Sequence, residues 1–226
     1  MNNSSFKDAT REQTSVLAPL ERAALRGLAR RMPAWVNSDH LSLLGLVAMF
    51  LAGVGYAVSG RNPLWLHGVN LCIFLNWFGD SLDGTLARYR DRQRPRYGFY
   101  VDHIIDTFGT MFLIFGLAVS GFMTERVAAA VLVVFLMLAI NSYLAAYALG
   151  IFKISHGKLG PTEIRLVLIA GNLALLYSAH TRIFGHEFLL FDVGGVIGIV
   201  VMATMLIYSS IKNTHTLYEL ERLPKS

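Results

Sequence analysis

Charged residues and cysteine are both scarce in this sequence. Only 15% of the 226 residues are charged, whereas 54% are hydrophobic, and the mean hydropathy of +0.48 is too high for an ordinary soluble domain. The single cysteine, Cys72, excludes a disulfide within the chain. The first forty residues lack the apolar core of a signal peptide, so we expect this segment to stay attached. Internal repeats, low-complexity tracts and HExxH-type metal spacing are also absent from the sequence.

Long apolar runs, by contrast, are abundant. Six stretches approach the ~20 residues that a helix needs to cross a membrane, and the second and fifth have the shortest apolar cores. The six are Leu41–Ser59, Leu64–Asp80, Phe99–Met123, Val127–Phe152, Ile164–Ala179 and Phe188–Ile211. The sequence therefore predicts an all-α integral membrane protein with six transmembrane helices.

The basic residues are distributed unevenly between the two sides of these spans. With six spans, 17 of the 20 Lys and Arg residues fall on one side, and only Arg61, Arg126 and Arg182 fall on the other. Lys and Arg near span ends collect on the cytoplasmic side of a membrane. We therefore expect both termini, and the loop between the second and third spans, to be cytoplasmic. The short loops favour a prokaryotic plasma membrane.

The segment before the first span has a pattern of its own. Leu20–Trp35 (LERAALRGLARRMPAW) alternates leucine and alanine with arginine at helical spacing, which predicts a cytoplasmic amphipathic helix lying in the membrane interface. A solvated helix is the alternative. The net charge of +5 suits contact between the basic residues at the span ends and anionic lipid headgroups. We therefore expect no nucleic-acid partner. The predicted organisation is an N-terminal segment (1–40), a six-span domain (41–211) and a cytoplasmic tail (212–226).

Four aspartates stand beside two of the apolar runs. If the second span continues as a helix, Asp80 and Asp83 share one face at spacing i, i+3, and Asp102 and Asp106 share a face of the third span at i, i+4. The short connection makes these spans antiparallel neighbours, so the two pairs can converge. Four converging carboxylates repel one another unless a cation compensates, and their oxygens suit Mg²⁺ or Mn²⁺.

The residues around the aspartates favour a phosphate ligand. Gly84 and Gly98 flank the pairs, and the absence of a side chain there lets a ligand come close. Arg88 adds a guanidinium suited to phosphate oxygens. Carboxylates, a divalent metal and an arginine at a membrane surface together indicate phosphoryl-group chemistry.

These residues form one ordered motif. The string Asp80-x2-Asp83-Gly84-x2-Ala87-Arg88-x9-Gly98-x3-Asp102-x3-Asp106 resembles the signature of the CDP-alcohol phosphatidyltransferases, also called CDP-alcohol phosphotransferases. Six spans with cytoplasmic termini and an N-terminal interfacial helix are similar to that family as well. A weaker similarity is Asp39-His40-Leu41-Ser42, which resembles the family's Pro-Asn-x-x-Thr entry with Ser38 and Asp39 in place of the Pro and Asn.

The resemblance implies a phospholipid-synthesising transferase that uses two divalent ions, Mg²⁺ or Mn²⁺. Asp80, Asp83 and Asp102 would be the core metal ligands, and Asp106 would lie near the metals and act as the catalytic base. An acceptor hydroxyl would lose its proton to Asp106 and attack the phosphorus distal to cytidine, with release of CMP. The residues expected around the nucleotide are Gly84, Ala87, Arg88 and Gly98.

The identity of the two substrates stays open. The donor implied by the resemblance is CDP-diacylglycerol or a CDP-amino alcohol. Lys158, Glu163 and Arg165 fall in a region that in this family helps to shape the acceptor pocket. Lys158 and Arg165 would bind the phosphate of a phosphorylated polyol, whereas Glu163 would face an amino alcohol. The His and Thr that follow the third and fourth aspartates look more like the choline/ethanolamine branch, in which diacylglycerol is the acceptor.

Several other interpretations stay open. The aspartates could be helix-end carboxylates paired with the arginine loop, and Asn76, Asn141 and Asn172 are more often interhelical hydrogen-bonding residues than substrate ligands. The GxxxG pattern in Gly194–Gly198 is typical of a packing or dimer seam, and we expect a homodimer. A carboxylate-lined transporter and a non-catalytic lipid-binding homologue are the alternative functions. Metal-dependent CMP release separates the enzyme from both.

Overall fold

Seven helices dominate the computed structural model, which describes residues 10–12, 18–153 and 160–223. The helices are α1 (Ala18–Arg31), α2 (Ser38–Ser59), α3 (Trp65–Tyr89), α4 (Pro95–Ser120), α5 (Glu125–Leu149), α6 (Pro161–Leu175) and α7 (Leu190–Leu220). Two short ladders join them: parallel β1 (Thr10–Glu12) with β2 (Ile151–Lys153), and antiparallel β3 (His180–Ile183) with β4 (His186–Leu189). The predicted all-α class is confirmed.

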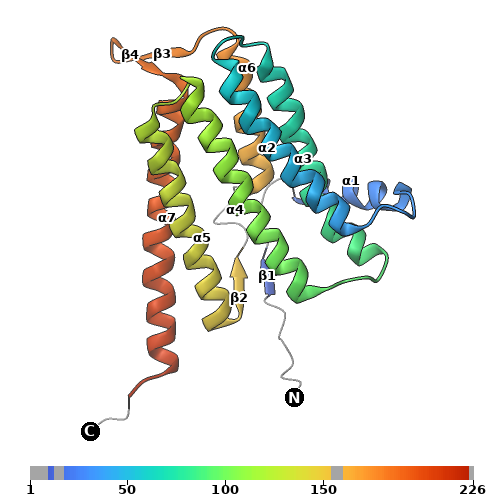
Figure 1. Ribbon diagram of the computed structural model, residues 1–226. Helices are drawn as coiled ribbons and strands as arrows, with labels where there is room; N and C mark the ends of the chain where they lie inside the picture. The colour runs from blue at the N-terminus through green and yellow to red at the C-terminus, as the bar shows by residue number, and fades with distance from the viewer. Residues whose placement is uncertain (1–9, 13–17, 154–159, 224–226) are drawn as a thin grey trace.

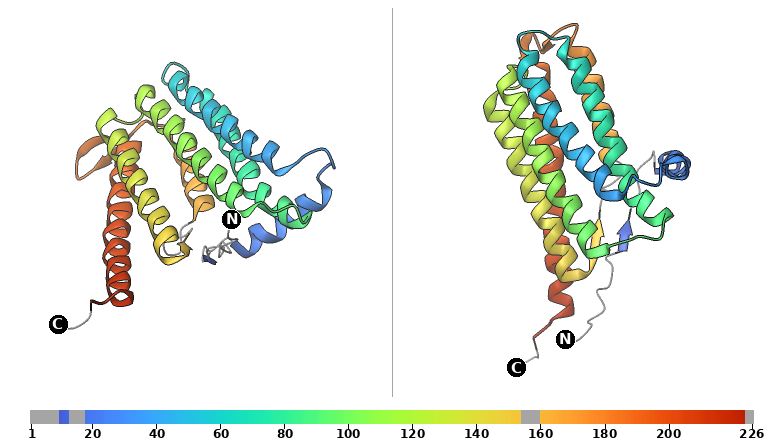
Figure 2. Two further views of the ribbon diagram at one scale, coloured as in Figure 1. Left: turned by 60° about the horizontal axis from the view of Figure 1, so that its bottom comes forward. Right: turned by 45° about the vertical axis from the view of Figure 1, so that its right-hand side comes forward.

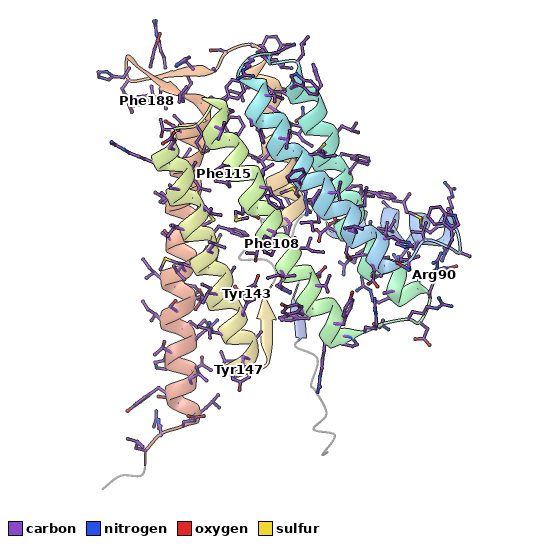
Figure 3. All side chains as sticks on the ribbon, in the orientation of Figure 1. Arg90, Phe108, Phe115, Tyr143, Tyr147 and Phe188 are labelled. Carbon is purple, nitrogen blue, oxygen red and sulfur yellow. The ribbon has the colours of Figure 1, made fainter. Side chains whose placement is uncertain are left out.

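Each of the six apolar runs lies largely within one helix, although Phe152 belongs to β2 and Phe188 to β4. The helices differ in how well they suit a membrane. Among the described residues, four helices, α2, α4, α5 and α7, are long and apolar enough to cross one. Helix α6 has only 15 residues, and α3, with 25, carries Asp80, Asp83 and Arg88 in its second half. Together with the exposed aromatic side chains on α4 and α5, such as Phe115 and Tyr147, these helices point to a membrane protein (Figure 3).

The predicted spans and the observed helices differ most at the ends of α3 and α7. Helix α3 continues nine residues past Asp80, and α7 continues nine residues past Ile211, into the segment assigned to the tail. Both ends contain polar residues that form helix without being apolar, so a hydropathy run detects only part of each helix. At the end of α3, Leu82 and Leu86 are fully buried at i, i+4 spacing, which stabilises the added turns.

The helices are arranged around α2. Helices α3 and α4 pack on either side of α2, α5 and α7 extend the row beyond α4, and α6 packs against α3 and α7 (Figures 1 and 2). The α3–α4 loop and the end of α7 lie at one end of the bundle, opposite the β3–β4 hairpin (Figure 1). We call these the arginine end and the hairpin end, after the arginines between Arg90 and Arg96 and after the hairpin residues 180–189.

Glycine allows the backbones of α2, α3 and α4 to touch. A Cβ added at Gly53 or Gly116 would lie closer than 3 Å to backbone atoms of the facing helix, and so would one at Gly79. Small residues at such seams are typical of packing between membrane helices. Helix α2 is therefore held at backbone distance from both helices that carry the aspartates.

Replacing Gly116 with Ala is expected to destabilise the protein by about 1–3 kcal/mol, because the added methyl group overpacks the α2–α4 seam. The measurement is thermal unfolding of the detergent-purified variant. Gly27→Ala is the matched control, since a Cβ at Gly27 of α1 meets nothing within 4 Å in the described residues. Equal melting temperatures for the two variants would contradict the packing argument.

Buried polar side chains tie the helices together. Asn172 on α6 accepts a hydrogen bond from the Tyr56 hydroxyl on α2 (2.7 Å) and donates one to Asn70 on α3 (2.7 Å). Asn141 on α5 donates to Ser209 on α7 (2.8 Å). These asparagines therefore make the interhelical hydrogen bonds that their sequence context predicts.

Helix α1 packs across the end of α3 at the arginine end (Figure 2). It begins two residues before the predicted helix Leu20–Trp35 and ends four residues earlier, at Arg31. Leu25 and Ala29 are buried in one apolar cluster with Leu82 and Leu86 of α3, whereas the arginines of α1 are exposed. One face of α1 is therefore committed to the bundle.

Candidate functional site

The four aspartates come from two helices that both pack on α2. Asp80 and Asp83 lie on α3, which remains helical through both positions, and Asp102 and Asp106 lie on α4, whose first residue is Pro95. Asp83 lies within electrostatic range of Asp80 and Asp102, and Asp106 within range of the other three aspartates. The structure therefore brings the two pairs together in one group, which we call the aspartate cluster.

Asp83 is the most firmly held member of the cluster. Its side chain is 6% exposed, and its carboxylate accepts hydrogen bonds from the Ser42 hydroxyl of α2 and from the Gly84 backbone N–H. The Ser38 hydroxyl donates to the Asp83 carbonyl oxygen (3.2 Å). The start of α2 thus fixes both the backbone and the side chain of Asp83.

Asp80 is paired with an arginine from α6. Nη2 of Arg165 lies 2.6 Å from Oδ2 of Asp80, and both side chains are largely buried. Arg165 also donates through Nε to Oδ1 of Asn76 (2.9 Å), and Asn76 donates to the Gly45 carbonyl of α2 (3.2 Å). Arg165, predicted in the acceptor pocket, therefore lies directly against the aspartate cluster.

The α4 side of the cluster is more open. Asp102 is half-buried, and Asp106, which lies within electrostatic range of the other carboxylates and Arg165, is accessible from the surface. His103 follows Asp102 in sequence, and the centroid of its ring lies 4.2 Å from that of Phe99 and 5.0 Å from that of Tyr143. These ring contacts give His103 a role in packing.

The donor chemistry of the cluster suits a divalent cation. Four carboxylates share the site with the Arg165 guanidinium, so the group carries an excess of negative charge when all are ionised. Hard oxygen donors of this kind are the ligands that Mg²⁺ and Mn²⁺ prefer. In the described ranges, however, no three His, Cys, Asp or Glu side chains already stand close enough to hold an ion. The residues fit the metal by chemistry, and no preformed metal site is shown.

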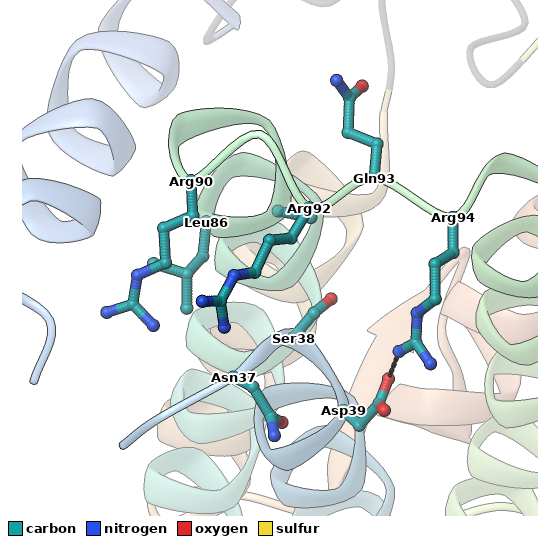
Figure 4. Close-up of a pocket in the computed structure, with 9 residues that line it drawn as sticks. Asn37, Ser38, Asp39, Leu86, Arg90, Arg92, Gln93 and Arg94 are labelled. Carbon is teal, nitrogen blue, oxygen red and sulfur yellow. Dashed lines mark hydrogen bonds and ion pairs between the residues drawn. The ribbon is translucent and has the colours of Figure 1, made fainter. Parts of the chain in front are cut away.

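A pocket of about 390 Å³ opens at the arginine end, one helical turn beyond Asp83 on α3 (Figure 4). It is lined by Asn37, Ser38, Asp39, Leu86, Ala87, Arg90, Arg92, Gln93 and Arg94. Arg94 pairs with Asp39, and the hydrogen bond that it donates raises the pKa of the guanidinium above its ordinary value, so this arginine stays charged. Arg90 donates to the carbonyls of Met32 (3.0 Å) and Pro33 (2.8 Å), which fixes the wall of the pocket.

The residues predicted around a nucleotide have different surroundings. Ala87 lines the pocket. A Cβ at Gly84 would lie 3.3 Å from Nη1 of Arg88, whose Nη2 donates to Thr85 (3.2 Å). A Cβ at Gly98 would meet nothing within 4 Å in the described residues, so this position borders open space.

The residues predicted in the acceptor pocket also differ in their surroundings. Arg165 reaches the aspartate cluster, whereas Glu163 accepts a hydrogen bond from the Gly160 backbone N–H (2.9 Å) and caps the start of α6. Lys158 lies outside the described residues. Arg165 therefore lies beside the aspartate cluster.

Two residues that contact the cluster were not assigned a site role from the sequence. Ser42 binds Asp83, and Asn76 binds Arg165. The signal for Asn76 was its position four residues before Asp80, on the same face of α3. Ser42 stands where the weaker Pro-Asn-x-x-Thr similarity has its Thr, which was the available clue.

A family model describes this part of the chain. The model for CDP-alcohol phosphatidyltransferase matches residues 35–211, more than three quarters of the sequence. The matched range includes all four aspartates, Arg165 and the residues of α2 that contact the cluster.

Proposed function

Since the chain belongs to the CDP-alcohol phosphatidyltransferase family, we propose that it transfers a phosphoalcohol group from a CDP-alcohol to an acceptor hydroxyl and releases CMP. The family implies a transferase of phospholipid synthesis whose partners are a CDP-alcohol and membrane lipids. The observation that carries the proposal is the convergence of two aspartate pairs from α3 and α4 with Arg165 of α6.

The aspartates divide into two roles. Asp80, Asp83 and Asp102, with Asp106 beside them, would hold two Mg²⁺ or Mn²⁺ ions, which when bound neutralise the charge of the donor diphosphate. Asp83 suits a fixed ligand because the Ser42 hydroxyl and the Gly84 backbone N–H hold its carboxylate in place. Asp106 suits the catalytic base because it remains accessible from the surface.

The proposed reaction transfers one proton and replaces one phosphorus–oxygen bond with another. The acceptor hydroxyl gives its proton to the Asp106 carboxylate, and its oxygen forms a bond to the phosphorus distal to cytidine. The bond between that phosphorus and the bridging oxygen breaks, and CMP leaves with the bridging oxygen and its electron pair. Arg165, held by Asp80 and Asn76, supplies a positive charge for a phosphate oxygen near this point.

The cytidine nucleotide is proposed to occupy the pocket that contains Ala87. This pocket lies one turn from Asp83, and its polar side chains, such as Asn37 and Gln93, offer hydrogen bonds to a pyrimidine. Arg92 and Arg94 supply positive charge close to a diphosphate. Gly84, Arg88 and Gly98 stay proposed neighbours of the nucleotide.

We further propose that α3 and α6 complete six membrane spans. The charge distribution supports a cytoplasmic arginine end in a plasma membrane, with the aspartate cluster opening on that side. A homodimer through α7 is supported by Gly194 and Gly198, where an added Cβ meets nothing within 4 Å in the described residues.

The proposal predicts metal-dependent CMP release from the detergent-purified protein. One set of reactions offers CDP-diacylglycerol with glycerol phosphate, inositol, inositol phosphate or serine, and the other offers CDP-choline or CDP-ethanolamine with diacylglycerol. One pair is expected to release CMP with Mg²⁺ or Mn²⁺, and EDTA is expected to abolish release until either metal is restored.

A measurement of CDP-alcohol binding distinguishes the two ways in which this proposal could fail. Binding of a CDP-alcohol without CMP release from any pair would indicate a binding-only homologue and overturn the transferase assignment for this chain. Absence of both binding and release would overturn the nucleotide pocket as well.

A further inference from the structure

We propose that Glu21 of α1 is a positioning residue, which holds the first turn of α6 and thereby sets Arg165 against the aspartate cluster. The inference rests on the proposed function for its catalytic consequence. It assigns to α1 a role in the reaction, although α1 contributes no residue to the cluster itself.

Glu21 joins three helices through one carboxylate oxygen. Its Oε1 accepts hydrogen bonds from Nε1 of Trp77 (2.8 Å) and the Ser81 hydroxyl (3.1 Å) on α3, and from the Thr162 hydroxyl on α6 (2.9 Å). All three donors are neutral, so the carboxylate makes charge-assisted hydrogen bonds that are stronger than neutral ones. Glu21 is half-buried, which limits the competition from water.

The donors to Glu21 lie on two helices, each of which carries a residue of the site. Trp77 and Ser81 lie four residues apart on one face of α3, and Ser81 adjoins Asp80 in sequence. Thr162 lies in the first turn of α6, directly after Pro161. Glu21 therefore connects the α3 segment that carries Asp80 to the beginning of the helix that carries Arg165.

The start of α6 is the part of that helix which needs such a support. Arg165 follows Thr162 by three residues, so the two side chains lie on neighbouring positions of one helical turn. Other contacts in this turn are the hydrogen bond that Glu163 accepts from the Gly160 backbone N–H and those that Arg165 donates to Asp80 and Asn76. A negative carboxylate at a helix N-terminus is also favourable for the helix dipole.

Loss of the Glu21–Thr162 hydrogen bond should therefore move Arg165 without removing any residue of the cluster. Asp83 is held independently by Ser42, so CDP-alcohol binding should remain close to that of the wild type. The contact that Arg165 makes with the acceptor or its phosphate should weaken. We expect KM for the acceptor to rise about tenfold, as for one lost charge-assisted hydrogen bond.

The experiment compares four single variants and one double variant. Glu21→Ala removes all three hydrogen bonds, Thr162→Val removes only the one to α6, and Trp77→Phe removes one to α3 and is the matched control. Glu21→Ala and Thr162→Val are expected to raise acceptor KM alike, with donor Kd unchanged, and the double variant should resemble Glu21→Ala because both remove the same hydrogen bond. Glu21→Gln, which keeps an acceptor oxygen, should recover part of the loss.

A second readout does not depend on activity. Hydrogen exchange of the amides in residues 162–170 should quicken in Glu21→Ala and Thr162→Val and stay unchanged in Trp77→Phe. If the wild type releases no CMP, the proposed function fails, and hydrogen exchange still tests the coupling. Wild-type acceptor KM and wild-type exchange in Thr162→Val would overturn the inference, because Glu21 would then only dock α1 on α3.

Discussion

Asp106→Asn is expected to lower kcat for CMP release by about 10³-fold or more while leaving CDP-alcohol binding largely intact, because a positioned base contributes about 10²–10⁴-fold. Asparagine has nearly the same shape as aspartate but cannot accept the proton of the acceptor hydroxyl. The change also removes one of four mutually repelling charges, so the fold should not suffer. CMP release under saturating substrates gives kcat, and calorimetric titration with the donor alone gives Kd.

Asp192→Asn is the matched control for this experiment. Asp192 lies at the start of α7, at the hairpin end, where it accepts a hydrogen bond from the Thr124 backbone N–H (2.7 Å). It makes the same chemical change far from the aspartate cluster and should retain near-normal kcat. Near-normal turnover in Asp106→Asn as well would remove the base assignment.

Asp83→Ala is expected to abolish both turnover and the metal-dependent part of CDP-alcohol binding. Asp83 is the buried, doubly hydrogen-bonded member of the cluster, so no neighbouring carboxylate is positioned to replace it. The measurement is a titration of the donor with and without Mg²⁺, accompanied by thermal unfolding to show that the variant is folded.

Ser42→Ala separates the role of the carboxylate from that of its support. This variant keeps Asp83 but removes the hydroxyl that orients it, and should weaken metal-dependent donor binding by about tenfold, as for one hydrogen bond to a charged group. Donor binding that still responds to Mg²⁺ in Asp83→Ala would contradict the assignment of Asp83 as a metal ligand.

The sequence predicted the helices and the meeting of the aspartates for clear physical reasons. Apolar runs mark segments that form helices, and the spacings i, i+3 and i, i+4 place each pair on one face. A short connection between α3 and α4 then limits how the faces can be arranged. The convergence of Asp80 and Asp83 with Asp102 and Asp106 follows from these local features.

The contacts of α1 and α6 could not be predicted in the same way. Glu21 and Thr162 are 141 residues apart, and Arg165 and Asp80 are 85 residues apart. Hydropathy and spacing describe one helix at a time and contain no information on which helices become neighbours. Only the packed structure shows that the acceptor-pocket candidate Arg165 faces a predicted metal ligand.

The hairpin between α6 and α7 was missed for a different reason. The predicted sixth span began at Phe188, but this residue belongs to β4, and the helix starts at Leu190. The turn residues Phe184 and Gly185 both have positive φ, and phenylalanine is an unusual residue in that conformation. These turn residues lie in the predicted loop, but the last two residues of β4, Phe188 and Leu189, are apolar and adjoin the apolar start of α7, so hydropathy counted them in the sixth span.

The glycine seams of α2 also have an evolutionary consequence. Because Gly79, Gly53 and Gly116 bring α3 and α4 to backbone distance from α2, the interval between the two aspartate pairs is set inside the bundle. The loop residues 91–94 therefore do not set this interval, although Arg92, Gln93 and Arg94 line the proposed nucleotide pocket. The three glycines should thus resist replacement during divergence, because a side chain at any of them would push apart helices that carry the aspartates.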